Sequence, residues 1–168
     1  MRILLAGVGR DGTNYDRSVA KPVPLGELAP VTTVTQRQLL EAKHGHDGHA
    51  RVWGISTNGT VAKAAARELA PGDQVYFHSG QSVFAVAEVV VIIPGAHGIA
   101  GRLWPGWTDS FVFTVTPPVP ANITKADVNA LLDYHIDRWQ GPRLLDESKS
   151  ARLAGRVGLA LLPEEAGR

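Results

Sequence analysis

The sequence contains no cysteine, which excludes disulfide bonds, thiolate catalysis and cysteine-based zinc sites. It also has almost no net charge, because 17 Lys and Arg residues oppose 16 Asp and Glu residues. No overall basic field therefore attracts nucleic acid, and any such surface must be local. No apolar run has membrane-spanning length, and the apolar stretch within residues 1–12 is too short for a signal peptide. We expect a cytoplasmic protein.

What is present is typical of a globular domain. The chain has 168 residues, of which 44% are hydrophobic and 20% charged, and this is enough to build a core without covalent links. We find no internal repeat and no low-complexity tract. The expected organisation is one domain over 1–168, in which 122–168 form a helical C-terminal extension.

Hydrophobic periodicity predicts an α+β domain in which strands surround a central helix. The predicted strands cover 2–8, 51–55, 74–78, 83–93 and 110–116. The predicted helices cover 35–43, 60–69, 124–139 and 143–161. The segment Ser79-Gly80-Gln81-Ser82 is expected to close a hairpin, and this order of strands favours a curved, largely antiparallel sheet or a partly open barrel.

Local signals set the expected ends of these elements. Thr35 with Gln38 forms a candidate capping box, and Thr124 with Asp127 forms a second helix start. The helix that begins at Thr124 is expected to end near Trp139, which then lies on an apolar stripe and serves as packing. A cluster of prolines is expected to end the sheet, namely Pro117, Pro118 and Pro120.

The spacing Gly7-x-Gly9-x-x-Gly12 after an apolar strand matches the dinucleotide-binding fingerprint. That fingerprint needs a helix that begins at the glycines. Here Asn14, Pro22 and Pro24 follow instead. A glycine-rich exit from a strand is the better interpretation.

Two other kinds of chemistry also lack support. The three closely spaced histidines His44, His46 and His49 lie in a Gly-rich segment, which favours a solvated loop over a metal site. No serine lies in a GxSxG nucleophile elbow. Nothing else in the sequence forms an evident carboxylate pair for acid–base catalysis, so the chain is expected to be no enzyme and to need no cofactor or metal.

Three of the four tryptophans lie on or beside predicted strands. Trp53 ends an apolar run, and Trp104 and Trp107 flank a Pro-Gly turn. Large aromatic residues in such places either fill the core or form a stacking cage for a flat ligand. Both interpretations remain open for Trp53 and Trp104, whereas Trp107 is the least core-like.

The order of motifs around these tryptophans resembles that of a known family. It consists of Trp53-Gly54-Ile55-Ser56-Thr57-Asn58, a helix, Val75-Tyr76-Phe77, Phe84-Ala85-Val86-Ala87-Glu88-Val89, Trp104, Trp107 and Phe111-Val112-Phe113. This order, over about 51–116, resembles the YTH domains, which read N6-methyladenine. The wider relationship is to the PUA superfamily, including EVE domains and the base-reading modules of modification-dependent restriction systems. Gly54 stands where a small hydroxyl residue is common in YTH domains.

The resemblance implies a PUA-like fold, with a curved, mainly antiparallel sheet or partly open barrel flanked by helices. It implies a reader that holds a modified base, with N6-methyladenine as the first choice, flipped or unpaired from DNA or RNA. A nuclease domain or subunit would be the partner. The implied base-binding residues are Trp53, Ser56, Thr57, Asn58, Trp104, Trp107 and Asp109. The candidate phosphate-binding residues are Arg10, Arg51 and Arg102.

Two alternatives stay open from the sequence. One is a small enzyme of the related ASCH type that acts on a modified nucleoside, although no catalytic residue can be placed. The other is a structural interaction domain whose tryptophans are buried. Exposure of the tryptophans at a cavity separates the second alternative from the others.

Overall fold

The computed structural model describes residues 1–56, 59–107, 110–139 and 141–161, and of residues 61–62 and 158–161 it describes the backbone only. The strands are β1 (Ile3–Gly7), β2 (Val23–Pro24), β3 (His49–Ser56), β4 (Gln74–His78), β5 (Ser82–Ile93), β6 (Ser110–Val115), β7 (Val119–Thr124) and β8 (Arg143–Leu144). The α-helices are α1 (Thr13–Tyr15), α2 (Leu25–Leu28), α3 (Val34–His44), α4 (Thr60–Glu68), α5 (His97–Leu103), α6 (Lys125–Leu132) and α7 (Glu147–Leu161). A π-helix (Asp16–Ala20) follows α1, and a 3-10 turn (Ala29–Val31) follows α2.

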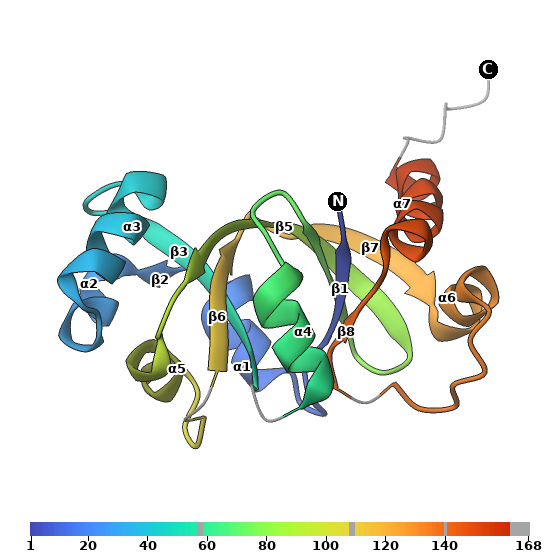
Figure 1. Cartoon of the computed structure of the whole chain (residues 1–168), viewed down its shortest axis with the longest axis horizontal. Coiled ribbons are helices and arrows are strands. Elements are labelled where there is room, and N and C mark those ends of the chain that lie inside the picture. The colour runs from blue at the N-terminus through green and yellow to red at the C-terminus, as the bar shows by residue number, and fades with distance from the viewer. Residues whose placement is uncertain (57–58, 108–109, 140, 162–168) are drawn as a thin grey trace.

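One curved sheet runs through the molecule in the order β2-β3-β6-β5-β4-β1-β8, and β7 pairs with β5 beside this path. The pairs are antiparallel except β1 with β4, which is parallel. β2 and β8 end the order, so the sheet does not close into a barrel. Figure 1 shows α2 and α3 at one end of the sheet, α6 and α7 at the other, and α4 between them.

The length of β5 explains the curvature. Its first half pairs with β4 and β7, and its second half pairs with β6, with register shifts near Val83 and Val89. Such irregularities bend a strand and increase its twist. One strand can therefore link two parts of the sheet that face different directions.

The centre of the sheet is covered on both faces. Along β1, Leu4 and Ala6 pack into one hydrophobic cluster, whereas Ile3 and Leu5 pack into a second. The larger cluster contains Trp53, Trp104, Phe77 of β4 and Phe113 of β6. The smaller one contains Tyr76 of β4 and lies under α6 and α7. Because successive strand residues face opposite sides, a strand buried on both faces reads as an unbroken apolar run.

The structure confirms the predicted α+β class, the β5 strand and the hairpin, in which Ser79 N donates to Ser82 O at 3.2 Å. Thr124 caps α6, since its hydroxyl accepts from Asp127 N at 3.1 Å. No described helix is both long and apolar enough to cross a membrane.

The capping box that begins α3 lies two residues earlier than predicted. Thr33 Oγ1 accepts from Gln36 N at 3.2 Å, and Gln36 Oε1 accepts from Thr33 N at 2.9 Å. Gln36 also donates to the carbonyls of Pro94 and Gly95. This tertiary contact favours Gln36 over Gln38, which a local motif cannot distinguish.

Two other expectations were wrong. The helix predicted to reach Trp139 ends at Leu132, because Asp133 adopts a left-handed conformation with φ 56°. The prolines do not end the sheet, since Pro120 lies within β7, opposite Ala85 and next to a register shift, where a missing N–H is tolerated. Short helices also occur within residues 10–34 and 97–103, where no helix was predicted.

Candidate functional site

An open cavity of about 830 Å³ lies where β1, β3 and β4 end. The hairpin after β4 and residues 137–139 and 141–142, which follow α6 far along the chain, complete its wall. The lining residues are Ala6, Gly7, Gly9, Arg10, Trp53, Gly54, Ile55, Ser56, His78, Ser79, Gly80, Gln81, Trp107, Asp137, Arg138, Trp139, Gly141 and Pro142. The volume falls within the range of about 300–1,000 Å³ of small-molecule sites.

Trp53 forms a rigid part of the cavity wall. It lies in β3 opposite Phe113 of β6, and only 3% of its surface is exposed. Its ring meets Phe77 edge to face, with centroids 5.5 Å apart, and Trp104 at 6.0 Å. These contacts hold the indole without a need for ligand, so Trp53 is both a core residue and part of the cavity surface.

The Pro-Gly turn separates the roles of Trp104 and Trp107. Trp107 N donates to Trp104 O at 3.0 Å, and Gly106 has a φ of 87°. With Pro105 before it, this is the arrangement of a type II turn. Trp104 is 1% exposed, does not line the cavity, and donates its Nε1–H to Ser18 Oγ at 3.2 Å. Trp107 is half-buried and lines the cavity, with its ring 5.2 Å from that of Trp104.

Trp139 is the third tryptophan of the cavity, and sequence reasoning missed it. It lies after α6 rather than on it. Its Nε1–H donates to Asn129 Oδ1 at 3.2 Å, and Asn129 Nδ2 donates to Ile136 O at 2.9 Å. Lys125 Nζ donates to Asp137 O at 2.7 Å and ties the same segment to α6. The Gly141-Pro142 pair after Trp139, similar to the Pro-Gly pair at Trp107, was the available signal.

His78 at the end of β4 meets Trp139 edge to face, with ring centroids 4.9 Å apart. It is 2% exposed, and its Nδ1 accepts from Gly80 N at 3.1 Å. Burial, together with the positive charge of Arg143, lowers the pKa of His78 from 6.5 to about 4. The imidazole is therefore neutral at physiological pH.

The predicted polar and charged residues distribute unevenly around this cavity. Ser56 lines it, whereas Thr57, Asn58 and Asp109 lie outside the described residues. Arg10 lines the cavity and is exposed. Arg138, which we did not predict, also lines the cavity and is exposed.

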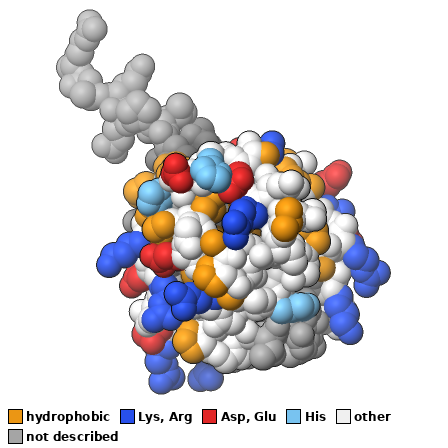
Figure 2. Space-filling model, turned by 90° about the vertical axis from the view of Figure 1, so that its left-hand side faces the viewer, with side chains coloured by type: hydrophobic (Ala, Val, Ile, Leu, Met, Phe, Trp, Pro, Cys, Tyr) orange, Lys and Arg blue, Asp and Glu red, His pale blue; other side chains and the backbone are white. Residues whose placement is uncertain are grey.

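The two other predicted arginines do not line the cavity. Arg51 donates to the carbonyls of Val19 and Ala20 and so links β3 to the π-helix. Arg102 is exposed on α5. On the face that carries α2 and α3, basic and acidic side chains are intermixed (Figure 2).

The glycine motif contributes to the cavity rather than to a nucleotide-binding helix. Gly7 and Gly9 line the cavity. Contrary to the sequence prediction, a short helix does begin after Gly12: α1 has three residues and continues directly as the π-helix Asp16–Ala20. A Cβ on Gly7 would lie 3.2 Å from His78 Cε1, so glycine leaves room for the imidazole.

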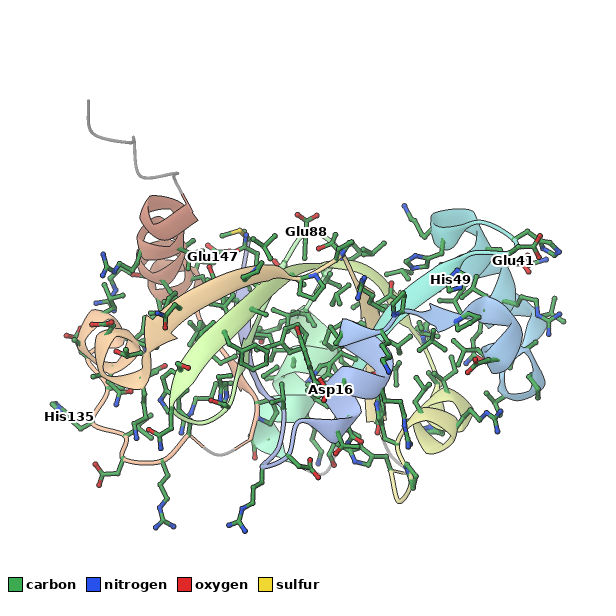
Figure 3. All side chains as sticks on the ribbon, turned by 180° about the vertical axis from the view of Figure 1, so that it is seen from behind. Asp16, Glu41, His49, Glu88, His135 and Glu147 are labelled. Carbon is green, nitrogen blue, oxygen red and sulfur yellow. The ribbon has the colours of Figure 1, made fainter. Side chains whose placement is uncertain are left out.

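Two of the three closely spaced histidines of residues 44–49 contact other side chains. His44 Nε2 lies 2.9 Å from Thr114 Oγ1, and His46 pairs with Glu41 at 3.1 Å. Within the described ranges no group of three or more metal-ligating residues is present. Figure 3 shows Glu41 and His49 together at the α3 end, far from His135 near α6.

Comparison with known proteins identifies the fold. No protein-family model matches the chain, and no curated protein matches it. Among solved structures, the N-terminal domain of Thermococcus gammatolerans McrB bound to m5C DNA is similar over 96% of this chain and 99% of that domain, with 14% identity and a TM-score of 0.66. A protein from Agrobacterium tumefaciens is similar over 97% of both chains, with 15% identity and a TM-score of 0.52. An ASCH protein from Zymomonas mobilis gives 8% identity and a TM-score of 0.45 over 91% of this chain and 94% of that one. The chain therefore has the PUA-like fold that the order of its motifs predicted.

Proposed function

We propose that this protein binds a modified base of a nucleic acid strand, displaced from its stack, in the cavity between β1, β3 and β4. The observation that carries the proposal is the convergence of Trp53, Trp107 and Trp139 on one open cavity of about 830 Å³. The likeness to the McrB domain bound to m5C DNA supports it at the level of the fold.

Aromatic walls suit a displaced base because it has two π-faces that stacking can cover. Stacking on an aromatic side chain contributes roughly 1–3 kcal/mol per base. Trp53 and Trp139 are held by Phe77 and Asn129 respectively, so their rings are ordered before the ligand arrives. Binding then loses little side-chain entropy at these positions. Trp107, half-buried on a short turn, is the ring with the most surface left for stacking.

The polar groups of the cavity suit the rest of a nucleotide. Arg10 and Arg138 lie on its wall and are exposed, so their guanidinium groups are available to phosphates on either side of the displaced base. Only these two basic side chains line the cavity among the described residues. A small number of phosphate contacts predicts a modest salt dependence.

The base we propose is N6-methyladenine, which the motif resemblance to YTH domains favours. The competing base is 5-methylcytosine, which is present in the DNA bound by the McrB domain. Either methyl group adds apolar surface that an indole can cover. We propose binding without chemistry, because Asp137 is the only carboxylate among the described lining residues, which leaves no pair for acid–base catalysis.

Titration of tryptophan fluorescence with matched oligonucleotides tests this function. The strands carry N6-methyladenine, 5-methylcytosine or no modification, as single-stranded DNA, double-stranded DNA and RNA. We expect quenching that prefers a modified strand. Trp107→Ala should bind roughly 5- to 150-fold more weakly, from the loss of one stacking contact. Trp104→Phe is the matched control, since Trp104 does not line the cavity.

Arginine variants test the proposed contacts to phosphates. Arg10→Gln and Arg138→Gln should weaken binding and reduce its salt dependence, whereas Arg102→Gln should change neither, because Arg102 does not line the cavity.

Equal affinity for modified and unmodified strands would refute the reader function. Turnover of free N6-methyladenosine, followed by chromatography, would instead favour an enzyme.

A further inference from the structure

The structure leaves one cavity group without an obvious structural use, the Nε2 atom of His78. The imidazole lines the cavity, and its other nitrogen accepts a hydrogen bond from Gly80 N. Nε2 lies 3.6 Å from the position that a Cβ on Gly7 would occupy, and Gly7 also lines the cavity. Among the described residues Nε2 has no hydrogen-bond partner. The buried side-chain nitrogen and oxygen atoms that lack both a partner and contact with solvent are Ser110 Oγ and Arg143 Nε, and Nε2 is not one of them. It is therefore reached from the cavity.

The contact with Gly80 fixes which nitrogen carries the proton. A backbone N–H can only donate, so Nδ1 must be unprotonated. The lowered pKa of His78 keeps the ring neutral at physiological pH. The single ring proton is then on Nε2, and the edge-to-face contact with Trp139 holds the ring in this orientation.

We propose that His78 Nε2–H is the hydrogen-bond donor that selects the bound base. It would donate to a ring nitrogen or a carbonyl oxygen on the edge of the base that points into the cavity. This inference rests on the proposed function and deepens it. The ligand class is a base that presents an acceptor to His78 while its faces contact the tryptophans. A base edge that presents only an N–H would leave two donors facing each other, and a buried unpaired donor is costly.

Two substitutions separate the donor from the fold. Asn at position 78 keeps an acceptor for Gly80 N, because asparagine side chains commonly bond to the backbone two residues on, but it lacks the distal donor. Gln at position 78 has an amide N–H that extends to about the position of Nε2. His78→Asn therefore removes the donor and keeps the turn, whereas His78→Gln restores a donor toward the cavity.

The experiment measures the affinity of the full chain and both variants for single-stranded DNA with one N6-methyladenine and, in parallel, with one 5-methylcytosine. We expect about tenfold weaker binding of the preferred strand by His78→Asn. His78→Gln should bind within about threefold of the original protein, which a purely structural role would not predict. Thermal unfolding of each variant confirms that it is folded, and ¹⁵N NMR of the free protein should find the proton on Nε2.

Each contrary result has its own meaning. Preferred binding by the original protein that His78→Asn leaves unchanged would overturn the role of His78 and leave the reader function intact. A proton on Nδ1 would overturn it as well, even without any ligand. No binding of either modified strand by the original protein would overturn the reader function, and with it this inference.

Discussion

The contact between Gly54 and Trp104 provides a direct test of how the tryptophans are packed. Gly54 lies in β3 between Trp53 and Ile55 and is buried. A Cβ at position 54 would lie 2.7 Å from Trp104 Cζ3 and 3.3 Å from Phe111 O. The first distance is shorter than real Cβ contacts allow, and Trp104 is enclosed by the core and cannot move freely.

Gly54→Ala should therefore destabilise the protein, although alanine ordinarily stabilises a strand relative to glycine. Overpacking of a filled core costs about 1–3 kcal/mol. For a chain of this size that cost corresponds to a fall in melting temperature of about 2–12 °C. Thermal and urea unfolding measure it.

Gly155→Ala is the matched control, because Gly155 lies exposed in α7 and a Cβ there would meet nothing within 4 Å. This change should stabilise by about 0.5–1 kcal/mol through helix propensity.

A double-mutant cycle identifies the clashing atoms. Trp104→Phe removes the far ring atoms of the indole, so Gly54→Ala should cost less in that background, with a coupling of about 1–2 kcal/mol. Additive costs would refute the reasoning, since they would mean that the Cβ does not meet Trp104. The same contact explains why glycine stands at position 54 instead of a hydroxyl residue.

Three further predictions follow from the contacts of single side chains. Thr33→Ala should destabilise the protein by about 1 kcal/mol in urea unfolding, through loss of the cap on α3. Thr35→Ala removes no cap and should be neutral or slightly stabilising. A larger loss of stability for Thr35→Ala than for Thr33→Ala would mean that the helix begins where the sequence predicted. Because the pKa of His78 is lowered from 6.5 to about 4, the unfolded chain takes up the proton first. The contribution of His78 to the free energy of unfolding should therefore fall by up to about 1.4 kcal/mol per pH unit as the pH drops from 6.5 to about 4. His78→Asn should lack this slope. An identical slope in the variant would assign the pH dependence to other groups. Asn129→Ala should release Trp139, shift its emission to longer wavelength and weaken oligonucleotide binding, and unchanged emission with unchanged affinity would mean that this link does not order the cavity.

Local chemistry in the sequence determined the class of the fold and most of its strands. The apolar run of β5, the Ser79–Ser82 hairpin and the Thr124 cap each depend on residues close together in the chain. Such features are readable because their energies are set within a few residues. The order of the aromatic motifs also predicted the PUA-like fold.

Choices between equivalent local signals needed the tertiary structure. Thr33 rather than Thr35 begins α3, because Gln36 reaches the carbonyls after β5. The helix α6 ends at Leu132, although apolar spacing continues to Trp139. In each case a distant contact or a single backbone conformation outweighs the local pattern.

The candidate site divides in the same way. The sequence by itself singled out Trp53, Trp104 and Trp107 as candidate base-binding residues and placed Trp107 beside a turn. Only the tertiary structure decided that Trp104 belongs to the core and that Trp139 and His78 belong to the cavity. The physical reason is that this cavity is built from strand ends and from residues 137–139 and 141–142, which are far apart in the sequence and meet only in the folded domain.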